Sequence, residues 1–183
     1  ISHEHIDHIR ALPSVLRRGD CRLVTTPGTR RMLRVEASTT DVAVGGRYST
    51  GDLDVHFVGV AHDATEPCGF LIEGGGERLA IFTDLGHATP AVLDALKAAR
   101  VIVLEANYDQ LMLRQGRYPA HLKRRISGPH GHLSNDDCAS TLIAAGLHAD
   151  SIWLAHLSEN NNHPSVAEAT VSDALRLHGR SQP

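Results

Sequence analysis

Three histidines and two carboxylates occupy one hexapeptide near the start of the chain, His3-Glu4-His5-Ile6-Asp7-His8. Imidazole and carboxylate are common ligands of transition metals, and imidazole also moves protons near neutral pH. In an extended stretch His3 and His5 point to the same side, and a turn after them would bring Asp7 and His8 beside the same point. One loop could therefore serve two neighbouring metal sites.

Two simpler interpretations of this hexapeptide are a solvated histidine-rich segment and the remnant of a tag. The residues that follow disfavour both, because Ile9, Leu12 and Leu16 have the spacing of an apolar helix face. A tag would not continue directly into a segment built to pack in a core. We therefore interpret the hexapeptide as part of a metal site.

The order HxHxDH is the signature of the metallo-β-lactamase superfamily, and the chain resembles this family at three further places. His62 follows a predicted strand shortly before Gly69-Phe70, Asp84 ends the next hairpin strand, and His156 ends the last predicted strand. The resemblance implies one metal ion on three histidines, a second on another three residues, and one bridging carboxylate: His3, His5 and His62; Asp7, His8 and His156; and Asp84. Nitrogen and oxygen ligands without thiolate suit zinc and manganese about equally. The implied cofactor is therefore a pair of divalent metal ions, Zn or Mn.

Such a metal pair would set the reaction and the charge of the substrate. Two divalent ions about 3.5 to 4 Å apart can hold a hydroxide nucleophile and stabilise the attacking and leaving oxygens of an in-line displacement. The ions carry four positive charges, of which Asp7 and Asp84 offset two, so an anionic substrate is favoured. We therefore expect a phosphate ester as substrate, with Asp7 and Asp84 as catalytic residues as well as ligands.

The distribution of basic residues favours the same class of substrate. Residues 110–135 contain five basic and no acidic side chains, whereas the rest of the chain has a net charge of −8. Lys123, Arg124 and Arg125 are predicted to bind the substrate, and the alternative is an exposed basic helix face. The segment ends where a loop meets a helix, so Ser134 and Asn135 are also predicted to bind substrate, through free backbone N–H groups that suit a phosphate.

His132 lies at the same junction, 24 residues before His156. In the phosphodiesterase branches of the superfamily a histidine at about this spacing contacts the scissile phosphate, so the resemblance implies that His132 binds substrate and is catalytic. More narrowly, the chain is similar to the WalJ (YycJ-like) subfamily, in segments that include 62–70, 83–86, 104–109, 131–135 and 156–161. Members are thought to be DNA exonucleases. The resemblance thus implies a metal-dependent phosphodiester hydrolase that acts on nucleic acid, DNA in preference to RNA.

Two other functions are compatible with parts of this pattern. A thioester or lactam hydrolase on the same scaffold would have no use for His132 or for an acid-free basic segment. A non-catalytic metal-binding module would be favoured if the site could not form. The metal content of the purified protein separates that module from both enzymes.

The segments that must position these residues alternate between strands and helices, which indicates an α/β fold. Strands are predicted at 22–26, 53–61, 68–73, 78–83, 101–105 and 152–157, and helices at 6–18, 27–35, 90–99, 135–145 and 166–177. A hairpin at 74–76, a helix start at Thr89-Pro90 and a capping box of Ser134 with Asp137 are also predicted. The resemblance implies a metallo-β-lactamase-type αββα sandwich. We expect a single domain over residues 1–183, incomplete at the N-terminus because it lacks about the first fifty residues of the family.

Composition excludes several other classes of protein. The 183 residues include 18 basic and 21 acidic side chains, a net charge of −3, which excludes a uniformly basic nucleic-acid coat and a polybasic membrane anchor. No apolar run approaches the roughly 20 residues that a membrane span needs, so we expect a cytoplasmic protein without a membrane partner. Three cysteines without CxxC spacing indicate neither a disulfide framework nor a thiolate zinc site. Nothing in the sequence specifies an oligomeric state.

Overall fold

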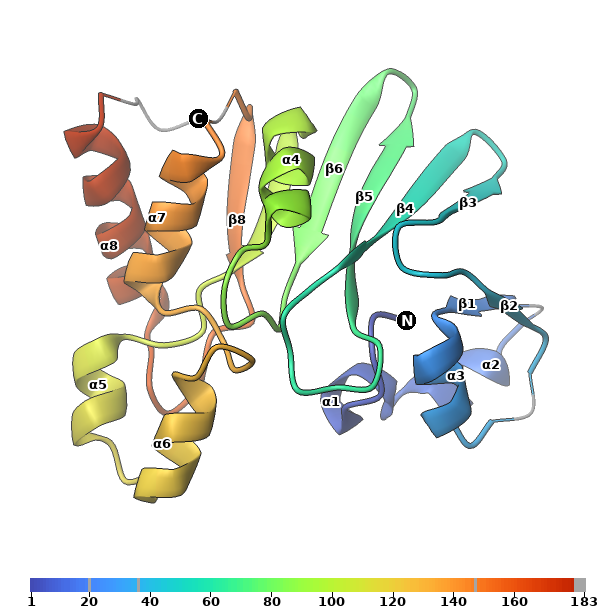
Figure 1. Cartoon of the computed structure of the whole chain (residues 1–183), viewed down its shortest axis with the longest axis horizontal. Coiled ribbons are helices and arrows are strands. Elements are labelled where there is room, and N and C mark those ends of the chain that lie inside the picture. The colour runs from blue at the N-terminus through green and yellow to red at the C-terminus, as the bar shows by residue number, and fades with distance from the viewer. Residues whose placement is uncertain (20, 36, 147, 180–183) are drawn as a thin grey trace.

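The computed structural model describes residues 1–19, 21–35, 37–146 and 148–179. At its centre is a six-stranded sheet in the order β3-β4-β5-β6-β7-β8, and a separate two-stranded parallel sheet joins β1 to β2 (Figure 1). The strands are β1 (Leu23–Thr25), β2 (Thr39–Asp41), β3 (Arg47–Thr50), β4 (Leu53–Gly59), β5 (Cys68–Gly74), β6 (Glu77–Phe82), β7 (Val101–Glu105) and β8 (Ser151–Ala155). The helices are α1 (Ile6–Ile9), α2 (Leu12–Leu16), α3 (Pro27–Met32), α4 (Pro90–Ala98), α5 (Gln110–Gln115), α6 (Ala120–Ile126), α7 (Asn135–Ala144) and α8 (Pro164–Leu177).

Four strands of the large sheet run in the same direction. Strands β3 to β6 form an antiparallel meander, and β6, β7 and β8 are parallel. Because β5 reverses the chain between β4 and β6, strand β4 points the same way as β6, β7 and β8. The C-terminal ends of these four strands therefore lie at one edge of the sheet.

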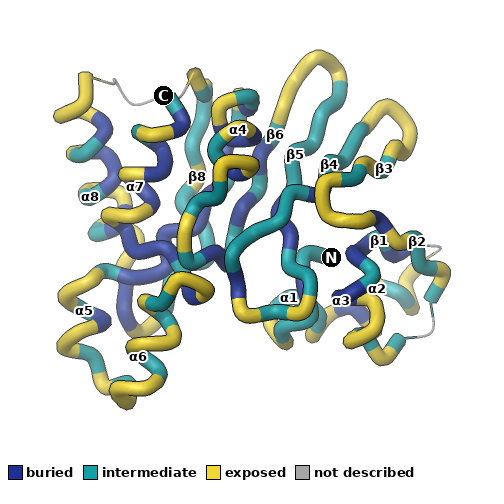
Figure 2. Tube along the Cα trace, viewed as in Figure 1, coloured by how far each residue is buried: buried dark blue, intermediate teal, exposed yellow. Residues whose placement is uncertain are grey.

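The main core fills the space between this sheet and helices α4, α7 and α8. Ala80 and Phe82 of β6 and Ile102 and Leu104 of β7 are fully buried in it, together with Leu96 of α4. The buried residues alternate along each strand, as the two-residue period of a strand requires. Figure 2 shows the same pattern, with buried segments on the central strands and on the helix sides that face them.

A second, smaller core lies on the other face of the sheet. Phe57 of β4 and Cys68 of β5 pack there with Val42, and Val24 of β1 packs against them. The neighbouring residue Val58 packs against the main core, so β4 separates the two cores. The small sheet is thereby held against the large one. The arrangement of helices against a mixed sheet confirms the predicted α/β class.

Most predicted elements are observed within a few residues of their expected bounds, but the single helix predicted over 6–18 is wrong. It is divided into α1 and α2, with Pro13 in the first turn of α2, where its missing N–H breaks no helical hydrogen bond. The hairpin is confirmed by positive φ angles at Gly75 and Gly76. The Thr89 cap and the Ser134 capping box are also present. Strands β2 and β3 and helices α5 and α6 are not predicted by the sequence patterns. Over the described part of the chain, no helix is long and apolar enough to cross a membrane.

Candidate metal centre

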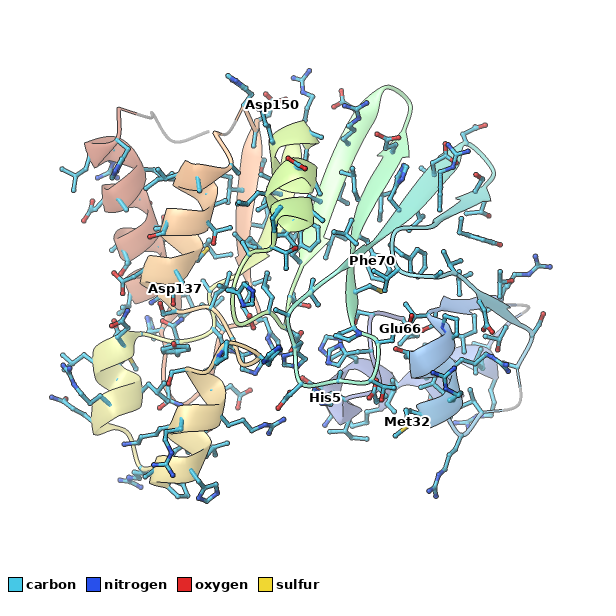
Figure 3. The ribbon with its side chains drawn as sticks, viewed as in Figure 1. His5, Met32, Glu66, Phe70, Asp137 and Asp150 are labelled. Atoms are coloured by element: carbon cyan, nitrogen blue, oxygen red, sulfur yellow. The ribbon has the colours of Figure 1, made fainter. Side chains whose placement is uncertain are left out.

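All seven residues that the sequence predicts as metal ligands meet at the edge of the sheet where β4, β6 and β8 end. Two of them precede α1, two lie within it, and the others follow β4, β6 and β8: His3 and His5, Asp7 and His8, His62, Asp84 and His156. Figure 3 shows His5 at this edge, below the ends of the strands. Segments far apart in sequence therefore contribute to one cluster.

The seven side chains form two groups of the size of a metal site. The ring nitrogens of His3, His5 and His62 lie within 4.8 Å of one another, and one ligand atom each from Asp7, His8, Asp84 and His156 form a second group by the same measure. The carboxylate of Asp84 lies between the groups: Oδ1 is 3.8 Å from His62 Nε2, and Oδ2 is 3.0 Å from His8 Nε2. This position suits the bridging role predicted for Asp84.

Buried polar atoms without partners make the cluster suitable for cations. The Nε2 atom of His3, a residue only 1% exposed, makes no hydrogen bond with any described residue. Asp84 Oδ2 also makes no hydrogen bond of acceptable geometry, although His8 Nε2 lies near it. An unsatisfied buried polar group costs about 1–3 kcal/mol, and a divalent cation would satisfy both atoms. The residues present therefore fit a pair of divalent metal ions held by nitrogen and oxygen.

The charge states within the cluster also suit metal binding. Burial lowers the pKa of His3 to about 4, with His8 acting in the same direction and Asp84 against it. Burial likewise lowers the pKa of His62. Burial raises the pKa of Asp84, but the nearby Nε2 of His8 and the neighbouring imidazoles outweigh it and hold that pKa well below its ordinary range. At neutral pH these histidines are neutral and Asp84 is ionised, as metal ligands must be.

The backbone is strained at two of the predicted ligands. Asp84 and His156 have φ angles of 59° and 55°, and no other non-glycine residue in the described ranges has a positive φ. Such a conformation costs of the order of 1–3 kcal/mol and is typical of functional sites. Residues of another segment, Glu105 and Asn107, form hydrogen bonds with both turns. The N–H of Leu85, next to Asp84, donates to Glu105, and Asn107 Nδ2 donates to the carbonyl of His156.

Glu105, the last residue of β7, is a site residue that the sequence analysis does not predict. It is fully buried, and four nitrogen atoms surround its carboxylate. Oε1 lies 2.8 Å from His132 Nδ1 and 2.6 Å from His156 Nδ1, and Oε2 accepts from the N–H groups of Leu85 and Leu133, both at 3.1 Å. The sequence offers one signal, a glutamate at the end of an apolar strand. If such a glutamate is buried, it needs polar partners, because a buried charge is rarely left without them.

Glu105 sets the orientation of both histidines. Burial raises the pKa of Glu105, but the hydrogen bonds from His132 and His156 bring that pKa below its ordinary value, so the carboxylate is ionised. Burial lowers the pKa of His156, whereas Glu105 and Asp84 raise it to about 9. With Nδ1 turned to Glu105, the Nε2 atom of His156 faces the second ligand group, 3.4 Å from Asp7 Oδ2. Such outer hydrogen bonds orient metal-ligating histidines.

His132 lies beside the cluster without belonging to either predicted ligand set. Its ring centroid is 5.1 Å from that of His62 and 5.4 Å from that of His156. The side chain is 20% exposed, and Glu105 holds its Nδ1. Its Nε2 makes no hydrogen bond with the described residues, so this atom is free to meet a bound molecule.

The prediction that Ser134 and Asn135 bind substrate is wrong, because the protein itself occupies their polar groups. Both residues are fully buried. Ser134 caps α7 in a reciprocal pair with Asp137, and the N–H of Asn135 donates to the carbonyl of Tyr108. The Asn135 side chain pairs with that of Asn162. The two residues therefore fix the loop that carries His132 and do not present donors to a phosphate.

The three predicted basic contacts differ in their surroundings. Lys123 Nζ donates to the carbonyl of Arg114 at 2.7 Å, which ties it to α5. Arg125 Nε lies 2.6 Å from Asp63 Oδ2, and Asp63 Oδ1 is 3.5 Å from His62 Nε2, so Arg125 is close to the metal cluster. Arg124 is exposed and has no partner among the described side chains. Of these three cations, Arg124 is therefore the most available for an external phosphate.

Comparisons with known proteins agree with this geometry. The chain matches the family described as "Beta-lactamase superfamily domain" over residues 1–157. The exodeoxyribonuclease YycJ of Bacillus anthracis is 36% identical over 188 residues, covering 98% of this chain and 70% of the relative. The exodeoxyribonuclease WalJ of Streptococcus pneumoniae is 32% identical over 184 residues, covering 96% and 68%.

Among solved structures, the metallo-β-lactamase fold protein YhfI from Bacillus subtilis superposes with a TM-score of 0.69 at 15% identity, over 94% of this chain and 69% of that one. At this identity the likeness concerns the fold alone, and it confirms the predicted metallo-β-lactamase fold. With the family match over most of the chain and relatives above 30% identity, the chain belongs to the metallo-β-lactamase superfamily and is related to YycJ and WalJ.

Proposed function

We propose that the protein is a dinuclear metal-dependent phosphodiesterase that degrades DNA as an exonuclease. The observation that carries the proposal is the placement of His132, beside both ligand groups, with Nδ1 held by a buried carboxylate and Nε2 free. A thioester or lactam hydrolase has no evident use for this histidine. The names of the two relatives, both exodeoxyribonucleases, support DNA as the substrate.

In this proposal, the seven ligand residues hold the metal pair in the two groups given above, with Asp84 between them. When bound, such a pair supplies an activated water and stabilises charge on the attacking and leaving oxygens. Glu105 accepts the Nδ1 proton of His132, and in the ring protonated on both nitrogens Nε2 is the atom that donates a hydrogen bond or proton to a phosphate or leaving oxygen. Arg124, which is exposed, contacts neighbouring phosphates and thereby positions the strand.

The test compares the wild type with His132→Ala on end-labelled single- and double-stranded DNA and RNA, with Mn(II) or Zn(II). Loss of one positioned donor or acid lowers kcat by about 10²- to 10³-fold. Metal stoichiometry should not change, because His132 is not a predicted ligand. His130→Ala is the matched control, since His130 is exposed in the same loop and its side chain makes no described contact. Wild-type turnover by His132→Ala would remove the main ground for a phosphodiesterase.

A further inference from the structure

The basic residues of this chain are concentrated in two segments. Residues 10–35, here called the arginine lobe, contain seven arginines and one acidic residue; residues 110–135, here called the basic arm, contain five basic residues and no acidic one. Together the two segments hold 12 of the 18 basic residues but 1 of the 21 acidic ones. The positive charge is therefore divided between two places, of which only the basic arm belongs to the function proposed above.

The arginines of the lobe are exposed, and most of them have no ion-pair partner among the residues that the structure describes. All seven arginines are exposed. Arg30 pairs with Asp41, and Arg17 contacts the hydroxyl of Ser14, but the other five have no described carboxylate within salt-bridge distance. Outside the two segments, by contrast, four arginines each pair with a carboxylate: Arg47, Arg78, Arg100 and Arg176. Unpaired like charges on one surface repel each other and attract an anion.

The loop that carries His62 joins the arginine lobe to the basic arm. At one end of it, Asp63 forms an ion pair with Arg125 of α6. At the other end, Glu66 Oε2 accepts a hydrogen bond of 2.5 Å from the N–H of Gly28 at the start of α3. The two basic segments therefore flank the metal centre, and Figure 1 shows α5 and α6 on one side of α1, with α2 and α3 on the other.

The contact between this loop and the arginine lobe is built closely. A Cβ atom at Gly28 would overlap the side chain of Glu66, so only glycine allows α3 to approach this far. The hydroxyl of Thr26 also donates to the carbonyl of Glu66, at 2.8 Å. The lobe is thus fixed relative to the ligand loop, and Figure 3 shows Glu66 between His5 and α3.

We propose that the arginine lobe is the second half of a polynucleotide-binding surface, so that the sugar–phosphate backbone of the substrate crosses the metal centre from the basic arm to the arginine lobe. This inference rests on the function proposed above. Every cation of the lobe is an arginine, and the planar guanidinium binds phosphate oxygens in pairs. Asp150 lies at the opposite end of the molecule (Figure 3) and is paired with Arg100, so that end offers no comparable group of unpaired arginines among the described residues.

The experiment measures binding of a fluorescent, cleavage-resistant phosphorothioate strand of about 20 thymidine nucleotides by anisotropy over a range of salt concentrations. The lobe variant is Arg10→Gln/Arg18→Gln/Arg31→Gln. Its matched control, Arg47→Gln/Arg78→Gln/Arg176→Gln, removes the same charge from paired arginines elsewhere. For a single strand, each phosphate contact contributes about −0.7 to the slope of log K against log salt concentration. The lobe variant removes three arginines, so the magnitude of its slope should be smaller than that of the wild type by about 2. Its affinity at low salt should fall about tenfold or more, and the control should stay within about twofold of the wild type.

A second measurement separates this proposal from the function on which it rests. Bis(p-nitrophenyl) phosphate is too short to reach the lobe, so its turnover should be equal in the wild type and the lobe variant. If the wild type hydrolyses no phosphodiester but binding of the strand still depends on the lobe, the proposed function fails and the binding surface stands. Unchanged binding by the lobe variant, an equal loss in the control variant, or a preference for phosphatidylserine vesicles over the strand would overturn the inference. Melting temperatures should not differ, because the substituted side chains are exposed.

Discussion

The carboxylate of Glu105 contacts both His156, a predicted metal ligand, and His132, the proposed catalytic histidine. Removing its charge tests whether both histidines depend on this one buried group. Glu105→Gln keeps the size of the side chain and replaces an acceptor of four hydrogen bonds with an amide. An amide carries one oxygen and an NH2 group that only donates. The NH2 group of the glutamine must therefore lie against either the two Nδ1 atoms or the two backbone N–H groups. Both pairs donate to the carboxylate in the wild type, so two donors would then face each other.

The cheaper arrangement places the amide NH2 against the imidazoles, because a neutral ring can accept at Nδ1 by carrying its proton on Nε2. Backbone N–H groups have no such freedom. In that tautomer, however, the Nε2 atom of His156 is protonated and cannot bind a metal ion. Loss of an outer partner of a ligating histidine typically costs about 10- to 100-fold in metal affinity or activity, or about 1.4–2.8 kcal/mol. We expect Glu105→Gln to weaken the second metal by that amount and to lower kcat.

The assay is a competition titration with a chromogenic zinc chelator, followed by kcat on end-labelled DNA at saturating metal. Glu73→Gln is the matched control, because Glu73 also holds a histidine, His56, at 3.2 Å, but does so on the half-exposed outer part of the sheet. The control should bind metal like the wild type. Two tightly bound metals and normal turnover in Glu105→Gln would refute the positioning role.

Three further outcomes are expected. The intact protein should hold close to two metal ions per chain and Asp84→Ala should lose both or nearly both; a single metal that survives this substitution would contradict the bridging role. Gly131→Ala should lower turnover and the melting temperature, because the new Cβ overlaps the carbonyl of Ile126 and displaces the carbonyl that contacts His62 Nδ1; Gly19→Ala, with open space around it, is the control. Ellman's reagent should modify one thiol of the native protein, Cys21, and three thiols after denaturation. Cys68 and Cys138 are buried, and burial raises their pKa values, to about 12 for Cys68. Rapid labelling of all three thiols in the native state would contradict the packing of both cores.

The clustering of the seven candidate ligands could be predicted from sequence because each combines a metal-binding side chain with the end of a recognisable strand or loop. Glu105 could not, because its role depends on pairing between distant strands. In the register of the sheet, Leu104 lies opposite Phe82, and Glu105 lies opposite Ala155, directly before His156. This places the carboxylate between the turns that follow β6 and β8. A glutamate at the end of an apolar strand is mostly exposed in proteins, so the local pattern alone does not place Glu105 between the two turns.

The predicted phosphate contact of Ser134 and Asn135 failed because the N–H groups of both residues have partners within the protein. The capping box predicted at Ser134 uses the N–H of Ser134 itself, and the N–H of Asn135 donates to the carbonyl of Tyr108. The net charge of −8 outside residues 110–135 averages over the excess of arginine in residues 10–35. The two segments become comparable only when the fold brings them to the same ligand loop.

The centre contains unfavourable energy that bound cations can offset. Asp84 and His156 adopt left-handed backbone conformations, and His3 Nε2 and Asp84 Oδ2 are buried without hydrogen bonds. Each of these four features costs of the order of 1–3 kcal/mol, which is a large fraction of the 5–15 kcal/mol that stabilises a typical domain. The surrounding sheet, the Glu105 network and the Asn107 contact hold the two turns in this arrangement. A binding site that is held ready in this way gains affinity because the ligand does not have to order it, which is the physical reason to find such strain at a metal centre and not in the core.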